Sequence, residues 1–426
     1  MIRFAIIAPA LRSHYGPLEC LAMELIERGH TVTFFHKAEA EHLLRLEPVR
    51  FCAVGHSAGP AGDSRSVTHL ASNLNNALDL HACAVHMART TRMLCQELPA
   101  ALRREKIEAL ICDQMEAAGG LVAQALNLPF VSIACALPVN REDITIPLPV
   151  LASPYERDPR SHKRYAWGAR CYDWLMKPHR KVVQREAEAL GLPPRDGLHS
   201  CLSPLAQISQ TVLEFDFPRP NLPPWFHEVG PLRRTSKDHD HLPYTLDRSR
   251  PFIYANLGDL RGARLRLCKR IAKACMALNA QLLIAHSGGL DHRQVDALLR
   301  AGATWVTDSG DPEVLVHYAD VVVTHAGLNA VLDAIVAEKP ILALPFAEDQ
   351  PGVAARVAYS GAGIHASPRA STKALIEHLQ HLLNNPWPAL EGLSDAVHGM
   401  GGTQRAADIV EAVIPDKFKL RLVSSR

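Results

Sequence analysis

His14 and Asp113 are two residues that could act together as a general base. His14 follows a predicted strand at residues 3–8, and Asp113 closes another at 108–113. Because the carboxyl ends of parallel strands share one edge of a sheet, we expect the two side chains to meet there. A carboxylate that holds an imidazole in one tautomer lets the second ring nitrogen accept a proton from a hydroxyl. The alternative is that Asp113 only caps a helix, a common role of Asp.

Small residues follow three predicted strands in the second half of the chain, and they indicate a phosphate site. These positions are Gly258, the segment 286–289 with Ser287, and the segment 325–329, which reads His-Ala-Gly-Leu-Asn. Small side chains let a ligand approach the backbone. Segment 325–329 leads into a predicted helix, whose oriented N–H groups and dipole attract an anion, and His325 adds a donor. The alternative is a capped turn with Asn329 as the N-cap and His325 hydrogen-bonded in the core.

The elements that must position these residues alternate between strands and helices. In the first half, the hydrophobic pattern predicts strands at 3–8, 31–35, 108–113 and 129–134 and helices at 17–29 and 117–128. In the second half, it predicts strands at 251–258, 280–289, 304–308, 320–325 and 340–346, with helices at 265–279 and after the last residue of segment 325–329. Alternation of this kind is typical of α/β proteins with parallel sheets.

A stretch rich in proline and charge separates the two halves. We predict an N-terminal acceptor-binding Rossmann-like domain at 1–216 and an interdomain linker at 217–250. A C-terminal donor-binding Rossmann-like domain is predicted at 251–402, and the remaining helix and tail at 403–426 are expected to pack back on the first domain. The 426 residues, 47% hydrophobic and 21% charged, suit two such cores.

The composition argues against several classes of protein. A formal net charge of +2 is too small for the basic surface that nucleic acid requires. Ten cysteines form no CxxC pair, which favours reduced thiols in a cytoplasm over disulfides or a zinc site. The first apolar run is short and broken by Pro9, so we expect a strand there rather than a secretory signal. No run approaches the length of a membrane span, and a cytoplasmic protein without a metal is predicted.

Motifs for other nucleotide and metal sites are absent or misplaced. The segment 361–366, GAGIHA, has glycine spacing close to that of a dinucleotide site, but it follows a helix-like segment rather than a strand. No GxxxxGK[ST] motif occurs. The segment 238–241, DHDH, lies in the predicted linker without a second set of ligands, so a solvated loop is the better interpretation.

Residues 305–357 resemble the nucleotide-sugar signature of the UDP-glycosyltransferase superfamily. Members have two facing Rossmann-like domains with a cleft between them, the GT-B arrangement. Segments 1–35, 111–142 and 201–210 also resemble the bacterial zeaxanthin glucosyltransferases of carotenoid biosynthesis, and the similarity extends over nearly the whole chain. The resemblance therefore implies a GT-B fold and an enzyme that glycosylates a lipophilic acceptor.

The resemblance also implies a role for each matching residue. His14 matches the general base and Asp113 its partner. The donor-binding matches are Trp305 for the uracil, His325, Gly327 and Asn329 for the diphosphate, Asp333 for the ribose, and Asp349 with Gln350 for the sugar hydroxyls. These roles imply a metal-independent, inverting transfer of glucose from UDP-glucose, a donor substrate rather than a cofactor, to a carotenoid hydroxyl such as that of zeaxanthin.

Three positions depart from the family pattern near the expected phosphate. Asn256 replaces a small hydroxyl residue, Asp259 follows Gly258, and Ala330 stands where serine is common. An ionised Asp259 aimed at a diphosphate would repel it. Two alternatives therefore stay open: a catalytically weak relative that binds a UDP-sugar or a carotenoid, and a glycosyltransferase for another lipophilic small molecule.

Residues 160–185 combine basic and aromatic side chains. Eight Lys and Arg residues are interleaved with Tyr165, Trp167, Tyr172 and Trp174. This mixture is typical of a helix that rests on anionic lipid, which would place the protein on the inner face of a membrane. The alternative is a solvated amphipathic helix whose aromatic side chains pack inward.

Overall fold

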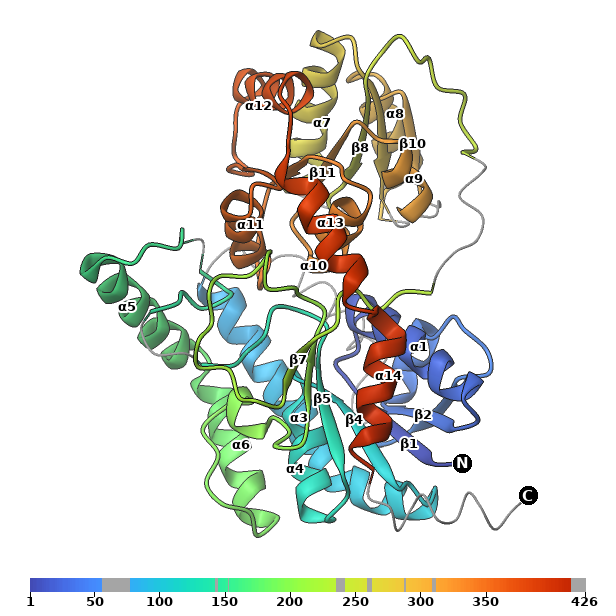
Figure 1. Cartoon of the computed structure of the whole chain (residues 1–426), viewed down its shortest axis with the longest axis vertical. Helices are drawn as coiled ribbons and strands as arrows, with labels where there is room; N and C mark the ends of the chain where they lie inside the picture. Colours follow the sequence, from blue (N-terminus) through green and yellow to red (C-terminus); the bar gives the residue numbers. More distant parts are fainter. Residues whose placement is uncertain are drawn as a thin grey trace.

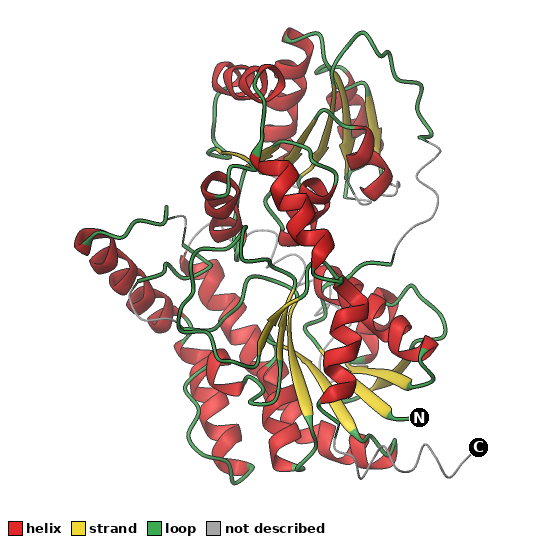
Figure 2. Ribbon diagram, viewed as in Figure 1, coloured by secondary structure: helices red, strands yellow, loops and turns green. Residues whose placement is uncertain are grey.

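The computed structural model of the chain describes residues 1–55, 77–141, 145–151, 153–234, 242–258, 263–286, 289–308 and 312–414. It consists of two α/β halves, each built on a parallel sheet covered by helices (Figures 1 and 2). The predicted fold class, two Rossmann-like domains, is therefore confirmed.

The first sheet has the strand order β3-β2-β1-β4-β5-β6-β7 in the described residues. Its strands are β1 (Arg3–Ile7), β2 (Thr31–His36), β3 (Arg50–Ala53), β4 (Ala109–Asp113), β5 (Phe130–Ala134), β6 (Gln207–Ser209) and β7 (Phe226–Glu228). Its helices are α1 (Arg12–Glu27), α3 (Ala77–Arg104), α4 (Ala117–Ala125), α5 (Pro159–Leu175) and α6 (Lys177–Ala189), with short 3₁₀ turns at Ala38–Leu43 and Leu198–Cys201. Strands β4 and β5 are buried at every position, as expected for central strands covered by helices on both faces.

The second sheet has the order β10-β9-β8-β11-β12-β13 in the described part. Its strands are β8 (Phe252–Asn256), β9 (Gln281–Ala285), β10 (Trp305–Thr307), β11 (Val321–Thr324), β12 (Ile341–Ala343) and β13 (Gly363–His365). The helices are α7 (Ala263–Ala277), α8 (His292–Leu299), α9 (Pro312–Tyr318), α10 (Leu328–Val336), α11 (Gln350–Tyr359), α12 (Thr372–Asn384), α13 (Ala389–Gly399) and α14 (Gly402–Ala412). The strand order changes direction between β8 and β11, which is where such sheets bind ligands.

Two differences from the sequence prediction bear on the site and on the extent of the first sheet. Helix α1 begins at Arg12, so His14 lies in its first turn rather than in a loop before it. The range 217–250, predicted as a linker, contains β7, which pairs in parallel with β6 and extends the first sheet. Strand β7 escapes a periodicity analysis because a three-residue strand has no measurable period. The start of α1 was predicted too late because Pro17 marked the predicted helix start, although it lies within α1.

The last described helix, α14, returns from the second half and lies against α1 of the first (Figure 1). Arg28, just after α1, donates hydrogen bonds to Asp408 at 2.7 Å and to Glu411 at 2.9 Å. At the start of α14, the amide of Gly402 donates to the carbonyl oxygen of Val229 at 2.7 Å. The chain thus passes between the halves twice, and the two passages are hydrogen-bonded to each other.

Candidate active site

His14 and Asp113 meet at the carboxyl edge of the first sheet. His14 Nδ1 and Asp113 Oδ2 are 2.8 Å apart, and both residues are buried. The other carboxylate oxygen of Asp113 accepts the amide of Met115 at 2.8 Å. Because an ionised carboxylate only accepts hydrogen bonds, Nδ1 carries the proton and the lone pair of Nε2 can receive one. The pair is therefore built as a base with an orienting partner.

The charges around His14 adjust how readily it takes a proton. Burial lowers the pKa of His14, but the charge and hydrogen bond of Asp113 outweigh this, and Glu348 and Asp349 raise the pKa further, so the net shift is upward. The last two residues belong to the second half of the chain. The protonation of the candidate base is therefore linked to residues from both halves.

Cys135 is the third polar side chain in this cluster. One ligand atom each from His14, Asp113 and Cys135 lies within 4.8 Å of the others. Burial raises the pKa of the Cys135 thiol well above its usual range, so it is protonated, and its Sγ donates weakly to the carbonyl oxygen of His14 at 3.7 Å. Metal ligands must be thiolate sulfur and unprotonated imidazole nitrogen, whereas here Nδ1 is bound to Asp113. Cys135 therefore packs against the His14–Asp113 pair as a neutral thiol.

The segment after β11 forms the expected tight turn before α10. Gly327 is the N-cap of α10, so the alternative with Asn329 as N-cap is wrong. Ala326 adopts a left-handed backbone with φ of 63°. A Cβ on Gly327 would lie 2.7 Å from His325 Nε2, closer than real Cβ contacts. A side chain at 327 would therefore have to displace the imidazole of His325, which lies directly over the backbone of this turn.

The state of His325 restricts the role predicted for it. Its Nδ1 lies 3.3 Å from the carbonyl oxygen of Asn256, so Nδ1 carries the hydrogen. Burial, followed by the positive charge of Arg264, lowers the pKa of His325 to about 4. The neutral ring then presents an unprotonated Nε2, which accepts hydrogen bonds. His325 can donate from Nε2 to a phosphate only after taking up a proton.

Asn329 and Asp333, on α10, are held in contacts with the first half of the chain. The side-chain Nδ2 of Asn329 donates a hydrogen bond to the carbonyl oxygen of Ser13 at 2.9 Å. The side-chain Oδ1 of Asn329 accepts one from Gln210 Nε2 at 3.2 Å. Asp333 Oδ1 accepts Arg233 Nε at 3.0 Å. Asn329 thereby joins the 325–329 turn to Ser13, the residue next to the candidate base. Arg233 was not predicted, because nothing in the sequence pairs it with a residue 100 positions away.

Asp349 and Gln350 lie at the N-terminus of α11. Asp349 Oδ2 accepts the amide of Leu137 at 3.1 Å, across to the first half of the chain. Burial raises the pKa of Asp349. Gln350 is buried, and its carbonyl oxygen accepts the amides of Phe346 at 3.0 Å and Ala347 at 3.2 Å, which fixes the preceding turn. The side chain of Gln350 also hydrogen-bonds the carboxyl group of Glu348.

Glu348, just before this pair, is a further acidic group that the sequence did not single out. Its backbone is left-handed, with φ of 59°. Burial is the main cause that raises the pKa of Glu348 to about 7, and the negative charge of Asp349 is the second. Since its charge also acts on His14, Glu348 belongs to the electrostatic environment of the base.

The turn after β8 lies beside His325. Gly258 has φ of 68°, and a Cβ there would lie 3.1 Å from Arg264 Nη1 and 3.6 Å from His325 Cε1. Asn256 Oδ1 accepts a hydrogen bond from the backbone N–H of Gly258 at 3.1 Å. Asn256, which stands where the family has a small hydroxyl residue, therefore stabilises this turn. Asp259 and Ser287 lie outside the described residues.

Arg264 is a cation of this region that sequence reasoning missed. Its side chain is buried, donates from Nη1 to the carbonyl oxygen of Leu257 at 3.0 Å, and lies 4.8 Å from the ring centroid of Phe346. Its charge also acts on His325. The sequence around it contains several arginines, so no local signal distinguishes the buried one.

The side chain of Trp305 packs against other aromatic side chains of the second domain. Its ring centroid is 5.3 Å from that of Tyr244 and 6.1 Å from that of Phe252, and the side chain adds to the core of the second domain. Its predicted contact with uracil stays a prediction.

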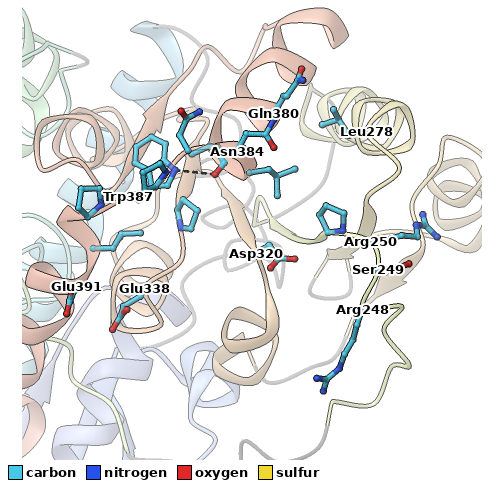
Figure 3. Close-up of a pocket in the computed structure, with 18 residues that line it drawn as sticks. Arg248, Ser249, Arg250, Leu278, Asp320, Glu338, Gln380, Asn384, Trp387 and Glu391 are labelled. Atoms are coloured by element: carbon cyan, nitrogen blue, oxygen red, sulfur yellow. Dashed lines mark hydrogen bonds between the residues drawn. The ribbon is translucent and has the colours of Figure 1, made fainter.

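A separate cavity of about 840 Å³ lies at the opposite edge of the second sheet (Figure 3). Its lining includes Asp320 and Pro340, which precede β11 and β12, together with Arg248, Glu338 and Trp387. It therefore faces the amino ends of the strands, away from His325, and it is not the site described above.

Two Rossmann-like halves, with the His14–Asp113 pair at an edge of one sheet and the 325–329 turn at an edge of the other, form a GT-B fold. The crystal structures of the kitacinnamycin glycosyltransferase and of CalG4, the calicheamicin glycosyltransferase, share this fold with TM-scores of 0.76 and 0.73. Each structure is 18% identical to this chain and covers 97% of it. The match spans 99% of the kitacinnamycin glycosyltransferase and 97% of CalG4.

Relatives at higher identity narrow the class. The chain is 44% identical to the zeaxanthin glucosyltransferase of Pantoea ananas over 97% of its length and 96% of the relative. It is also 44% identical to that of Pseudescherichia vulneris, over 97% and 98%. The model of the family described as "UDP-glucoronosyl and UDP-glucosyl transferase" matches residues 204–389. The chain belongs to this family and is a glycosyltransferase.

Proposed function

We propose that this chain transfers glucose from UDP-glucose to a hydroxyl of a carotenoid such as zeaxanthin, with inversion and without a metal. The buried His14–Asp113 pair, with Nε2 available to take a proton, is the observation that carries the proposal. The activity named for relatives 44% identical over nearly the whole chain supports the choice of sugar and acceptor.

In the proposed reaction, the acceptor hydroxyl gives its proton to Nε2 of His14 as its oxygen attacks the anomeric carbon of glucose. The bond from that carbon to the UDP oxygen breaks, and UDP leaves with the electron pair. Asp113 stabilises the imidazolium that forms. Attack from the side opposite the leaving group inverts the anomeric centre. The N-terminus of α10 and the guanidinium of Arg264 favour the charge on the departing diphosphate.

The proposed donor contacts follow the turn geometry. His325, protonated when the diphosphate arrives, and the backbone at Gly258 and Gly327 would contact the phosphates. The NH₂ group of Gln350 and the carboxylate of Asp349 would contact the sugar hydroxyls, with Asp333 at the ribose and Trp305 at the uracil. Peripheral contact with a membrane, through residues 160–185, would bring the protein to its acceptor.

The test is transfer of labelled glucose from UDP-glucose to zeaxanthin in detergent micelles, with UDP binding measured in parallel. We expect a glucoside from the wild-type protein and none above background from His14→Ala. His42→Ala, which changes an exposed histidine whose ring is bonded to the carbonyl oxygen of Glu39, is the matched control. Wild-type protein that binds UDP but forms no glucoside would instead support a binding protein, and transfer to other lipophilic alcohols alone would correct the acceptor.

A further inference from the structure

Helix α5 and the start of α6 carry a set of exposed basic and aromatic side chains. Within α5 these side chains recur every three or four residues and lie on one face, and two more lie in the first turns of α6. They are Arg160, Lys163, Arg164, Trp167, Arg170, Trp174, Lys177 and Lys181, and each is exposed. Figure 1 shows α5 at the edge of the molecule, away from both sheets. We call this set the α5 stripe.

The aromatic residues of α5 divide between two environments. Tyr165 is buried and donates its hydroxyl to the carbonyl oxygen of Pro154 at 2.6 Å. Trp167 and Trp174 are each 68% exposed, although indole is among the most costly side chains to leave in water. The interpretation of inward-packed aromatics is therefore correct for Tyr165 and wrong for the two tryptophans.

The charge of the α5 stripe is almost wholly uncompensated. Arg164 pairs with Glu156 at 2.9 Å, whereas the other five cations make no ion pair within the described residues. Asp173, the acidic residue of α5, is half-buried and bound by Arg141. The exposed stripe therefore has several positive charges and two indole rings but no carboxylate of its own.

We propose that the α5 stripe binds the surface of an anionic lipid bilayer, with the indoles of Trp167 and Trp174 in the interface and the basic side chains against the head groups. Indole is suited to this layer because one end is apolar and the other can hydrogen-bond. Lysine and arginine are attracted to anionic head groups by about 1 kcal/mol each. No helix within the described residues is long and apolar enough to cross a bilayer, so this contact is peripheral.

The packing next to α5 leads from this surface to the candidate active site. The side chain of Leu151 fills the space at Gly168 of α5, where a Cβ would lie 2.6 Å from it. Two residues earlier, the carbonyl of Pro149 contacts Gly352 of α11, where a Cβ would lie 2.1 Å from it. The bilayer surface is thereby connected, over a few residues, to the N-terminus of α11 that holds Gln350. This link to a lipophilic acceptor rests on the proposed function, whereas the lipid contact itself does not.

Sedimentation of the full chain with vesicles tests the contact without any substrate. We expect binding to vesicles of phosphatidylcholine with 30% phosphatidylglycerol at low salt, weakened by raised salt and by pure phosphatidylcholine. Replacing Lys163 and Arg170 with glutamine should weaken binding by about 25-fold, about fivefold for each cation. Replacing Trp167 and Trp174 with alanine should weaken it by roughly tenfold and remove the quenching of tryptophan fluorescence by brominated lipid.

The matched control lies on α7, in the other half of the chain. Arg266, Lys273 and Met276 are exposed there, and changing them to Gln, Gln and Ala removes two cations and an apolar side chain from another surface. This variant should bind vesicles as the wild type does. The proposal would be overturned by an equal loss of binding in the control or by equal binding to neutral vesicles. It would also be overturned by no binding at low salt, which would leave an acidic protein as the partner of this surface. A failure of glucosyl transfer with intact vesicle binding would overturn the proposed function alone.

Discussion

The two sheet edges that form the candidate site are built in different ways. In the first domain, the chemistry is complete within the protein: His14 and Asp113 are buried, 2.8 Å apart and in a fixed tautomer. In the second domain, the site consists of a glycine turn and a neutral His325 whose free nitrogen is an acceptor. The His14–Asp113 pair is therefore preorganised, whereas under the proposed function the 325–329 turn reaches its working charge state only when the donor binds.

The largest effect should follow from breaking the preorganised pair. His14→Ala removes the group that takes the acceptor proton, so kcat should fall roughly 10²- to 10⁴-fold. Asp113→Asn presents an amide that can turn a donor to Nδ1 and select the wrong tautomer, and a loss of roughly 10²-fold or more is expected. The affinity for UDP, measured by calorimetry, should stay within about twofold in both variants, since neither residue lies in the donor turn. A large loss of UDP affinity would remove the distinction between the two edges.

The next effect should come from filling the donor turn. In Gly327→Ala, the new Cβ would lie 2.7 Å from His325 Nε2, so the imidazole or the turn must move. We expect KM for UDP-glucose to rise about 10- to 100-fold, with a smaller change in kcat. Gly392→Ala is the control, because a Cβ there meets nothing within 4 Å. An unchanged KM in Gly327→Ala would place the diphosphate elsewhere.

A proton should enter the second-domain site together with the diphosphate. Because the pKa of His325 is about 4 without a ligand, the ring is neutral at pH 7, and a diphosphate beside Nε2 raises this pKa. Calorimetry of UDP binding in buffers of different ionisation enthalpy should show uptake of up to one proton per site at pH 7. His325→Gln, whose amide donates without titrating, should bind UDP within about tenfold of the wild type and lose the uptake. Equal uptake in this variant would assign the proton to another group.

The smallest effect tests the coupling between the two domains. The negative charge of Glu348 raises the pKa of His14, so Glu348→Gln should lower that pKa. Since the base works only when neutral, the acid limb of the rate against pH should move to lower pH, by less than about one unit. The maximal rate at high pH should change little. A shift to higher pH would show that Glu348 does not act on the base through its charge.

The sequence was sufficient to locate side chains whose chemistry depends on strand ends. His14 and Asp113 could be paired because both follow buried strands in a parallel sheet, and Gly327 because small residues interrupt a strand–helix junction. Arg233 and Arg264 could not be found in this way, since their contacts depend on tertiary packing. Trp305 shows the same limit, because its packing against Tyr244 depends on a segment 61 positions earlier.

The short strands mark a second limit. Strands β6 and β7 have three residues each, and they take their pairing from the neighbouring strand rather than from a pattern of their own. Strand β7 therefore adds to the first sheet beyond the boundary drawn from the prolines.

The hydrogen bond between Gly402 and Val229 also ties together the two passages of chain between the domains. A Cβ on Gly230 would lie 3.0 Å from the carbonyl oxygen of Val397, and one on Gly402 would lie 3.0 Å from that of Pro231, so the two passages of chain touch along their length. Two bonded passages constrain the relative orientation of the domains more than a single passage would. They thereby help to keep Ser13, next to His14, within hydrogen-bonding distance of Asn329.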